Sequence, residues 1–188
     1  MKIVEIKITL EDVKPTVSRI LQVPADIRLD RLHLTLQAAF GWTNSHLYMF
    51  EAEGATWGLV DPEFGVEDHP ANKTTLSQVV EDTSKKTINY IYDFGDNWEH
   101  KIKIGKITDP VHGELYPELT EVTGKCPPED IGGFPGYEHF LEAIADPEHP
   151  EHDELKEWYG ETFDPNQPET NQLILNVLKL AKRWKQRK

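Results

Sequence analysis

In the N-terminal part of the chain, hydrophobic and polar positions alternate in short runs, which is the pattern of half-buried β-strands. Two such runs cover residues 2–10 and 16–23, and the break at Lys14-Pro15 between them predicts a β-hairpin that ends at Pro24. A third run at 46–52 predicts another strand. The chain therefore opens with the strands of a sheet.

The clearest strand pattern lies near the centre of the chain. Hydrophobic residues alternate with polar ones over 88–94 and again over 98–104. The Gly-Asp-Asn sequence at 95–97 joins the two runs, and these residue types favour tight turns. We therefore expect a second hairpin here.

A different periodicity, with hydrophobic residues three or four positions apart, predicts helices. We expect helices at about 27–40, 76–81, 137–145, 151–159 and 169–184. Asp26 is the expected N-cap of the first helix, because its carboxylate can accept hydrogen bonds from free backbone amides. Gly41 is its expected stop, because glycine readily adopts the left-handed conformation. Thr74 or Thr75 is the expected cap of the second helix.

Residues 54–73 and 109–136 are rich in proline, glycine and acidic residues, and we expect them to be loops. The predicted fold class is α+β, since strands dominate the beginning of the chain and helices its end. We expect one domain over residues 1–188, with an antiparallel sheet built from the N-terminal and central hairpins, a helix after the second strand, and a helical C-terminal third. Residues 1–108 would be mainly β with one or two helices, 109–136 a Pro/Gly-rich loop, and 137–188 helical.

Composition narrows the classes of function. The 188 residues contain 33 acidic and 20 basic side chains, and the net charge of −13 argues against a general nucleic-acid binder or docking on an anionic membrane. No apolar run reaches the length of about 18 residues that spans a bilayer. The charged N-terminus does not have the pattern of a secretory signal, and one cysteine cannot form an internal disulfide. We therefore expect a cytoplasmic protein.

The negative charge is concentrated in one segment. Residues 109–169 contain 17 acidic and two basic side chains, whereas residues 170–188 contain six basic side chains and no acidic one. A basic end suits a C-terminal helix because of the helix dipole. Alternatively, the basic tail from Lys179 to Lys188 folds against the acidic segment or contacts a partner, nucleic acid included.

Three blocks of sequence follow one another in a distinctive order. They are Gly41-Trp42 with His46-Leu47, then Tyr92-Asp93-Phe94-Gly95-Asp96-Asn97-Trp98-Glu99-His100, then Cys126-Pro127-Pro128-Glu129-Asp130-Ile131-Gly132-Gly133 with Gly136-Tyr137. In this order and spacing they closely resemble the plasmid pRiA4b ORF-3-like family, from the first strand to the Trp158 region. The resemblance implies an α+β domain without an established activity, and some relatives resemble proteins labelled transposon resolvases. Many relatives have a cysteine in place of Ile131, so the resemblance does not support a two-cysteine metal site in this chain.

The central hairpin and the Cys126 block carry the residues best suited to chemistry. Paired strands lie about 5 Å apart, so Asp93 could approach the return strand, and His46 joins it if its own strand pairs nearby. Carboxylates beside an imidazole can bind divalent cations or perform acid–base catalysis. The candidate binding cluster consists of His46, Asp93, Asp96, Trp98, His100, Glu129 and Asp130. The candidate ligands within it for a divalent Zn, Mn or Fe ion are His46, Asp93, His100 and Glu129.

Each of these residues also has a structural interpretation. Aspartate and asparagine favour turns because they hydrogen-bond their own backbone, and Trp98 can pack in the core or across strands. Cys126 is expected to be a small buried thiol, since no nucleophile signature surrounds it. His149 and His152 are expected to be exposed helix-cap residues rather than ligands.

Three functions stay open at this level. No Walker loop, dinucleotide fingerprint, nucleophile elbow or His-Glu-x-x-His motif is present, so no catalytic residue is assigned. The favoured hypothesis is a non-enzymatic module that binds an unidentified protein, because Trp42, Trp57, Trp98 and Tyr137 would suit an interface if they were exposed. The alternatives are a metal-dependent or acid–base enzyme using the His/Asp/Glu cluster, and a mobile-element-associated nucleic-acid accessory protein. No cofactor is predicted apart from the divalent metal that the cluster could hold.

Overall fold

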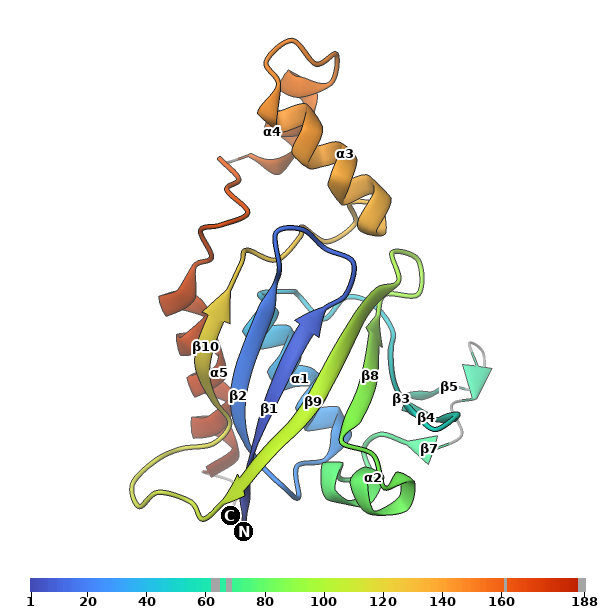
Figure 1. Cartoon of the computed structure of the whole chain (residues 1–188), viewed down its shortest axis with the longest axis vertical. Helices are drawn as coiled ribbons and strands as arrows, with labels where there is room; N and C mark the ends of the chain where they lie inside the picture. Colours follow the sequence, from blue (N-terminus) through green and yellow to red (C-terminus); the bar gives the residue numbers. More distant parts are fainter. Residues whose placement is uncertain (62–64, 67–68, 161, 186–188) are drawn as a thin grey trace.

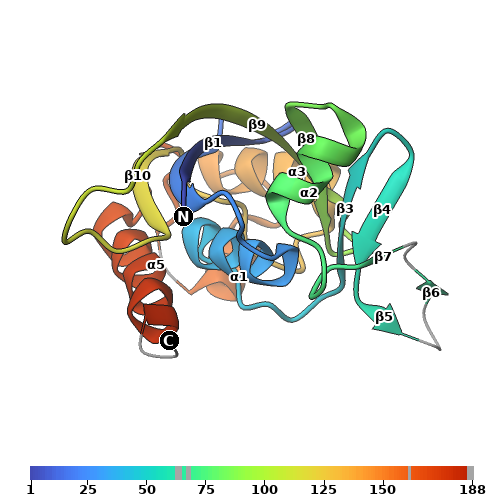
Figure 2. The same cartoon turned by 90° about the horizontal axis from the view of Figure 1, so that it is seen from below.

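A curved sheet wraps around helix α1 (Leu29–Phe40), as Figures 1 and 2 show. The computed structural model describes residues 1–61, 65–66, 69–160 and 162–185. The sheet has eight strands in the order β10-β2-β1-β9-β8-β3-β4-β7, and neighbours are antiparallel except for the parallel pair β4 and β7. The fold is therefore α+β, as the sequence predicts.

The strands of the main sheet are β1 (Ile3–Leu10), β2 (Ser18–Pro24), β3 (Tyr48–Ala52), β4 (Ala55–Gly58), β7 (His69–Pro70), β8 (Thr87–Tyr92), β9 (Trp98–Thr108) and β10 (Glu118–Thr123). A separate two-stranded sheet pairs β5 (Val60–Asp61) with β6 (Gly65–Val66). Both predicted hairpins are present, and β1 pairs with β9, so the two hairpins lie side by side at the centre of the main sheet. The buried positions of these strands, Ile6 and Ile102 among them, face the core.

Helix α1 fills the concave side of the sheet because its apolar face, with Leu29, Leu32 and Leu36, is fully buried. Gly41 ends the helix in the left-handed conformation with a φ of 87°, as predicted. The prediction that Asp26 caps the helix is wrong, because Arg28 occupies the N-cap position without a side-chain hydrogen bond.

The remaining helices are α2 (Leu76–Thr83), α3 (Gly133–Ala145), α4 (His152–Tyr159) and α5 (Thr170–Lys185). Thr75 caps α2 through a capping box with Gln78. Helix α5 packs against α1 and β10, and it buries Leu173 and Val177. Helices α3 and α4 form an arm that extends beyond one end of the sheet (Figure 1). Within the described part of the chain, no helix is long and apolar enough to cross a membrane.

Two segments that were expected to be loops contribute strands. Within 109–136, β10 pairs with β2 at the sheet edge and buries Leu119, although charged neighbours mask its short apolar alternation. Within 54–73, β4 and β7 extend the other edge. Helix α3 begins at Gly133 rather than 137, because the first turn of a helix tolerates Pro135.

The basic tail is partly described. Lys182, Arg183 and Lys185 occupy the last turn of α5, where the helix dipole favours positive charge. Residues 186–188 lie outside the described part of the chain. The contact of this tail with a partner stays a prediction.

Candidate functional site

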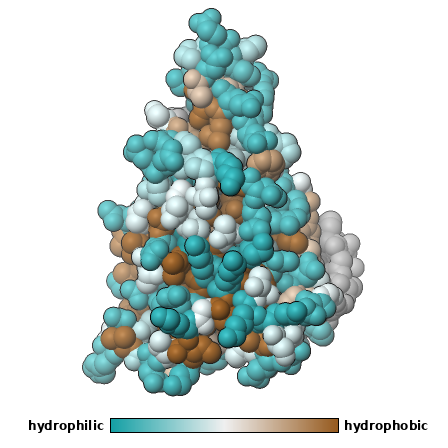
Figure 3. All heavy atoms as spheres, viewed as in Figure 1, coloured by the Kyte–Doolittle hydropathy of each residue, from teal (hydrophilic) through white to brown (hydrophobic). Residues whose placement is uncertain are grey.

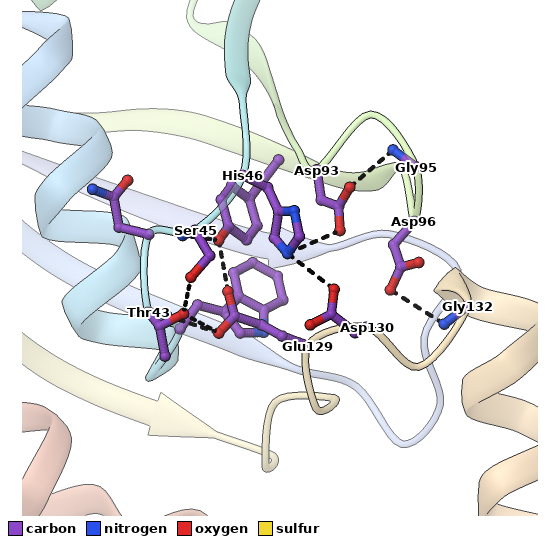
Figure 4. A network of polar contacts seen from close by, with 12 residues as sticks. Thr43, Ser45, His46, Asp93, Gly95, Asp96, Glu129, Asp130 and Gly132 are labelled. Atoms are coloured by element: carbon purple, nitrogen blue, oxygen red, sulfur yellow. Dashed lines mark hydrogen bonds and ion pairs between the residues drawn. The ribbon is translucent and has the colours of Figure 1, made fainter.

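Three loops meet at one end of the sheet, and each comes from one of the three sequence blocks. They are the segment 41–47 after α1, the turn 93–97 between β8 and β9, and the segment 126–132 before α3 (Figure 4). Strand β3 follows the first loop and pairs with β8, so it brings His46 beside the turn. The fold thus brings the three blocks together.

His46 lies between two carboxylates at the centre of this site. Its Nε2 atom is 3.0 Å from Oδ1 of Asp130 and 3.6 Å from Oδ2 of Asp93. This nitrogen is shielded from solvent, yet it forms no hydrogen bond of acceptable geometry with a described residue. An imidazole nitrogen that faces two carboxylate oxygens without a hydrogen bond is a polar group that still lacks a proper partner.

The backbone of both aspartates is held in an unusual conformation. Asp93 and Asp130 have φ angles of 60° and 59°, in the left-handed region that aspartate tolerates better than most residues. The Oδ1 atom of Asp93 accepts a hydrogen bond of 2.9 Å from the Gly95 amide within the turn. That bond leaves Oδ2 of Asp93, whose side chain is largely buried, directed at His46.

Glu129 lies beside this group but serves the loops rather than His46. Its Oε2 atom accepts hydrogen bonds from the Thr43 amide (2.9 Å) and hydroxyl (2.7 Å), and its Oε1 accepts one from the Tyr92 hydroxyl (2.6 Å). Burial, followed by the bond to Glu129, raises the pKa of Tyr92, so this hydroxyl stays a donor at neutral pH. Glu129 therefore ties the first and third loops to strand β8.

The start of α3 rests directly on the hairpin turn. The Gly132 amide donates to Oδ2 of Asp96 at 3.3 Å. At Gly133, a Cβ atom would lie only 2.4 Å from the backbone oxygen of Asp96, so the close approach requires glycine. Asp96 is thus a contact between loops and does not face His46 (Figure 4).

His100 and Trp98 do not join the site. His100 is 1% exposed and packs edge-on against Phe40 and Trp42, and its Nδ1 lies 3.0 Å from the Trp98 carbonyl oxygen. Burial lowers the pKa of His100 to about 3, so it is neutral and donates that hydrogen bond. Both residues occupy the buried face of β9, two positions apart, so the expectation that they contribute to the binding cluster is wrong for a geometric reason.

The aromatic residues that favoured a protein interface are all buried. Trp42, Trp57, Trp98 and Tyr137 are at most 8% exposed. They fill the core, so they do not form an interaction surface. Binding to a protein partner stays a prediction, without this support.

A cavity of about 650 Å³ opens beside the candidate ligands. His46 and Asp93 lie in its wall, and none of its described lining residues is lysine or arginine. Two large apolar side chains in the lining, Leu59 and Phe94, are about half exposed. The lining consists of Asp30, His33, Leu34, Asn44, Ser45, His46, Leu47, Tyr48, Leu59, Asp93, Phe94 and Gly95.

The deep side of the cavity contains a second histidine with a different character. His33 stacks on Tyr48 with ring centroids 3.6 Å apart, and it hydrogen-bonds Tyr90 and Asn44. Burial lowers the pKa of His33 to about 4, although the bond to Asn44 opposes this change. His33 is therefore a neutral part of the wall, and both of its nitrogens already have partners.

The spacing of His46, Asp93 and Asp130 fits a divalent metal. Their ligand atoms all lie within 4.8 Å of one another. Two ligands bound at about 2.1 Å lie about 3.4 Å apart in tetrahedral geometry and about 3.0 Å apart in octahedral geometry. The observed separations of 3.0 and 3.6 Å are close to these values. A set of three protein ligands also leaves coordination positions open for water or another ligand.

The structure also bears on the role expected for Cys126. Burial raises the pKa of the Cys126 thiol, which fits the expected structural role.

The sequence analysis did not identify Thr43 and Tyr92 as partners of Glu129. Their local sequence patterns do not indicate contacts with a residue so far away in the chain. The run of polar residues from Thr43 to His46, directly after Trp42, is the signal in the sequence that could have indicated a polar site in this loop.

Comparisons with known proteins agree with this fold. A family model described as plasmid pRiA4b ORF-3-like protein matches residues 2–172. The uncharacterized protein y4hQ of Sinorhizobium fredii (strain NBRC 101917 / NGR234) is 48% identical over 183 residues, which cover 97% of this chain and 94% of that protein. The crystal structure of a protein of unknown function from Methanosarcina mazei Go1 has a TM-score of 0.81 and 31% identity, and the match covers 91% of this chain and 96% of that chain. Both relatives are described without an activity.

Proposed function

The chain belongs to the plasmid pRiA4b ORF-3-like family, and from this premise we propose that it is a divalent-metal-binding domain. His46, Asp93 and Asp130 hold the ion at the wall of the 650 Å³ cavity, where its open positions are available to a small ligand. The observation that carries this proposal is the shielded Nε2 of His46, which faces two carboxylate oxygens and forms no hydrogen bond with any residue that the structure describes.

The charge of the site supports a cation. The site contains two aspartate side chains and one histidine, so its formal charge is −2 when histidine is counted as neutral. A divalent ion would balance that charge. Among biological metals, one imidazole with two carboxylates suits Mn²⁺, Fe²⁺ or Zn²⁺ better than a soft ion such as Cu(I), which prefers thiolate ligands.

The position of the site also supports ligand binding. Glu129 joins the first and third loops to strand β8 through Thr43 and Tyr92, so the backbone around the ligands is held in place before any ion arrives. The Asp130 side chain itself is 72% exposed and can adjust to an ion. A metal with open positions can polarise a bound carbonyl or activate water. The alternative of a metal-dependent enzyme therefore rests on the same three residues, whereas an acid–base site without metal has less support, because His100 lies in the core.

Metal titration of the purified chain tests the proposal. An ion that binds the native state raises the melting temperature in a saturable manner. We expect Mn²⁺ and Zn²⁺ to do so for the wild type, and the Asp130→Asn variant to weaken Mn²⁺ binding by more than about 10-fold, since even outer-shell changes cost that much. Asparagine tolerates the left-handed backbone at this position and has nearly the same shape, so the fold should be retained.

Asp96→Asn is the matched control, because Asp96 lies in the same loop cluster but contacts Gly132 instead of His46. Its Mn²⁺ affinity should stay within about twofold of the wild type. Equal Mn²⁺ affinity for the wild type and Asp130→Asn, measured by calorimetry, would overturn the proposal. We also propose a cytoplasmic location and a protein partner.

A further inference from the structure

A second cluster of metal-ligating side chains lies on the arm, away from the loops around His46. His139 on α3, His149 in the connection between the helices, and Glu151 at the N-cap of α4 place one ligand atom each within 4.8 Å of one another. The ring centroids of the two histidines are 5.3 Å apart, and Nε2 of His139 pairs with a carboxylate oxygen of Glu151. From this geometry we infer a zinc-binding site that joins α3 to the start of α4.

The ligand set matches the chemistry of zinc. Two imidazoles and one glutamate form one of the common three-residue zinc sets, which leaves a fourth position for water. The spacing His139-x9-His149-x-Glu151 brings the three residues together only because the chain reverses between α3 and α4. The sequence analysis treated His149 as a cap residue because it did not place His139 beside it. His139 lies ten positions earlier, on helix α3.

The connection between the helices is held by its own hydrogen bonds. The amides of Glu148 and His149 donate to Asp146, and the amide of His152 donates to the carbonyl of His149. The His152 ring, through Nδ1, bonds the carbonyl of Ala143 at 2.8 Å. These contacts fix the backbone on which two of the three ligands sit, which lowers the entropic cost of ordering them around an ion.

Two existing contacts would change when zinc binds. The Glu151 amide donates to Nδ1 of His149 at 3.1 Å, so a neutral His149 has its lone pair on that atom. Zinc bound there replaces the amide as its partner, and the amide turns to solvent at this exposed helix start. The contact between His139 and Glu151 is likewise replaced by two bonds to the ion.

The charge of the arm favours a cation. Residues 138–157 contain eight acidic side chains and one basic one, Lys156. The visible face of the arm is mostly hydrophilic (Figure 3), and α4 buries none of its residues completely. A negative surface of this kind concentrates cations near the imidazoles. The apolar contacts between α3 and α4 include Phe140, whose ring meets those of Trp158 and Tyr159.

Zinc on this cluster would stabilise the part of the fold that carries Asp130. Helix α3 begins at Gly133, directly after the loop of Asp130, and its start is packed on Asp96. A clamp between α3 and α4 therefore stiffens the arm from its far end. The inference stands on its own residues and does not depend on the site at His46.

Native mass spectrometry of the full chain with Zn²⁺ as the probe tests this inference. The Asp130→Asn variant removes the first site, and we expect it to retain one zinc ion per chain. Adding Glu151→Gln to that variant should abolish the remaining ion. Adding Glu148→Gln instead should leave the zinc ion bound. This substitution removes the same charge from the same connection, but Glu148 lies outside the cluster.

The outcomes separate the two sites. If the proposal for His46 fails, the wild type binds one zinc ion, and Glu151→Gln still removes it. The arm is not a zinc site if the Glu151→Gln and Glu148→Gln variants bind zinc equally well. The same conclusion follows if His139→Gln binds as much zinc as the wild type. His139 and Glu151 are both about half exposed, so these substitutions leave the core intact.

Discussion

His46 and His100 lie close to the same hairpin, yet they have opposite surroundings. His100 is enclosed by Phe40, Trp42 and Tyr90, and its hydrogen bonds go to backbone carbonyls. His46 stands at the loop edge with 28% of its side chain exposed, and its Nε2 faces two carboxylates. Two histidines near one turn thus divide into a structural residue and a candidate ligand. Nε2 lacks a hydrogen-bond partner among the described residues in both histidines, so the difference lies in what surrounds it: aromatic rings around His100 and two carboxylates beside His46. The sequence pattern alone does not reveal these surroundings.

Removing each imidazole ring in turn should have opposite effects on stability and on metal binding. His100→Ala should lower the free energy of unfolding by about 3 kcal/mol, because it leaves a cavity among aromatic rings. Its Mn²⁺ affinity should change little. His46→Ala should cost about 1 kcal/mol or less without metal and should abolish the stabilisation by Mn²⁺. Urea unfolding with and without Mn²⁺ measures both quantities, and a reversed pattern would refute the division of roles.

A second prediction concerns the contact between α3 and the hairpin turn. Gly133→Ala should cost about 2 kcal/mol or more, because its Cβ would lie 2.4 Å from the Asp96 oxygen and its φ is positive. It should also weaken Mn²⁺ binding, since it displaces the loop of Asp130. Gly113→Ala is the control: its φ is 93° but no atom lies within 4 Å of the added Cβ, so only backbone strain is introduced. Equal losses in the free energy of unfolding for the two variants would show that the close contact between Gly133 and Asp96 does not contribute to the cost.

A third prediction concerns the effect of pH on the two buried histidines. Burial lowers the pKa of His33 to about 4 and that of His100 to about 3, so the unfolded chain binds more protons than the folded one below the ordinary pKa of about 6.5. Stability should therefore fall as the pH drops from about 6.5 toward 4, with a slope of up to about 1.4 kcal/mol per pH unit for each histidine. His100→Phe should remove one share of the slope. Urea midpoints across this pH range provide the measurement, and an unchanged slope would contradict the assignment.

Much of the fold follows from periodicity, and what was missed has identifiable causes. The two hairpins, α1 and α5 carry long apolar patterns, and the structure contains all four. Strand β10 was missed because only Leu119 is fully buried in it, and the start of α3 was missed because Pro135 resembles a loop residue. In both cases, contacts with distant segments outweigh a weak local signal.

The site was predictable as a set of blocks but not as a geometry. The sequence blocks contain His46, Asp93 and Asp130, which the fold brings together, and also Glu129 and Asp96, which lie nearby and join the loops. Asp130 was expected in the binding cluster but not among the metal ligands, whereas the expected ligands His100 and Glu129 do not face His46. Which carboxylate faces the imidazole depends on the left-handed backbone of two aspartates and on the pairing of β3 with β8. Neither is encoded by residue spacing alone.

Anomalous diffraction from crystals soaked in Mn²⁺ would locate the ion in the site. We expect a manganese peak at about 2.0–2.3 Å from Nε2 of His46, Oδ2 of Asp93 and Oδ1 of Asp130, with further oxygen ligands directed toward the cavity. No such peak at a saturating Mn²⁺ concentration, with His46 instead hydrogen-bonded to Asp130, would contradict the proposed metal site.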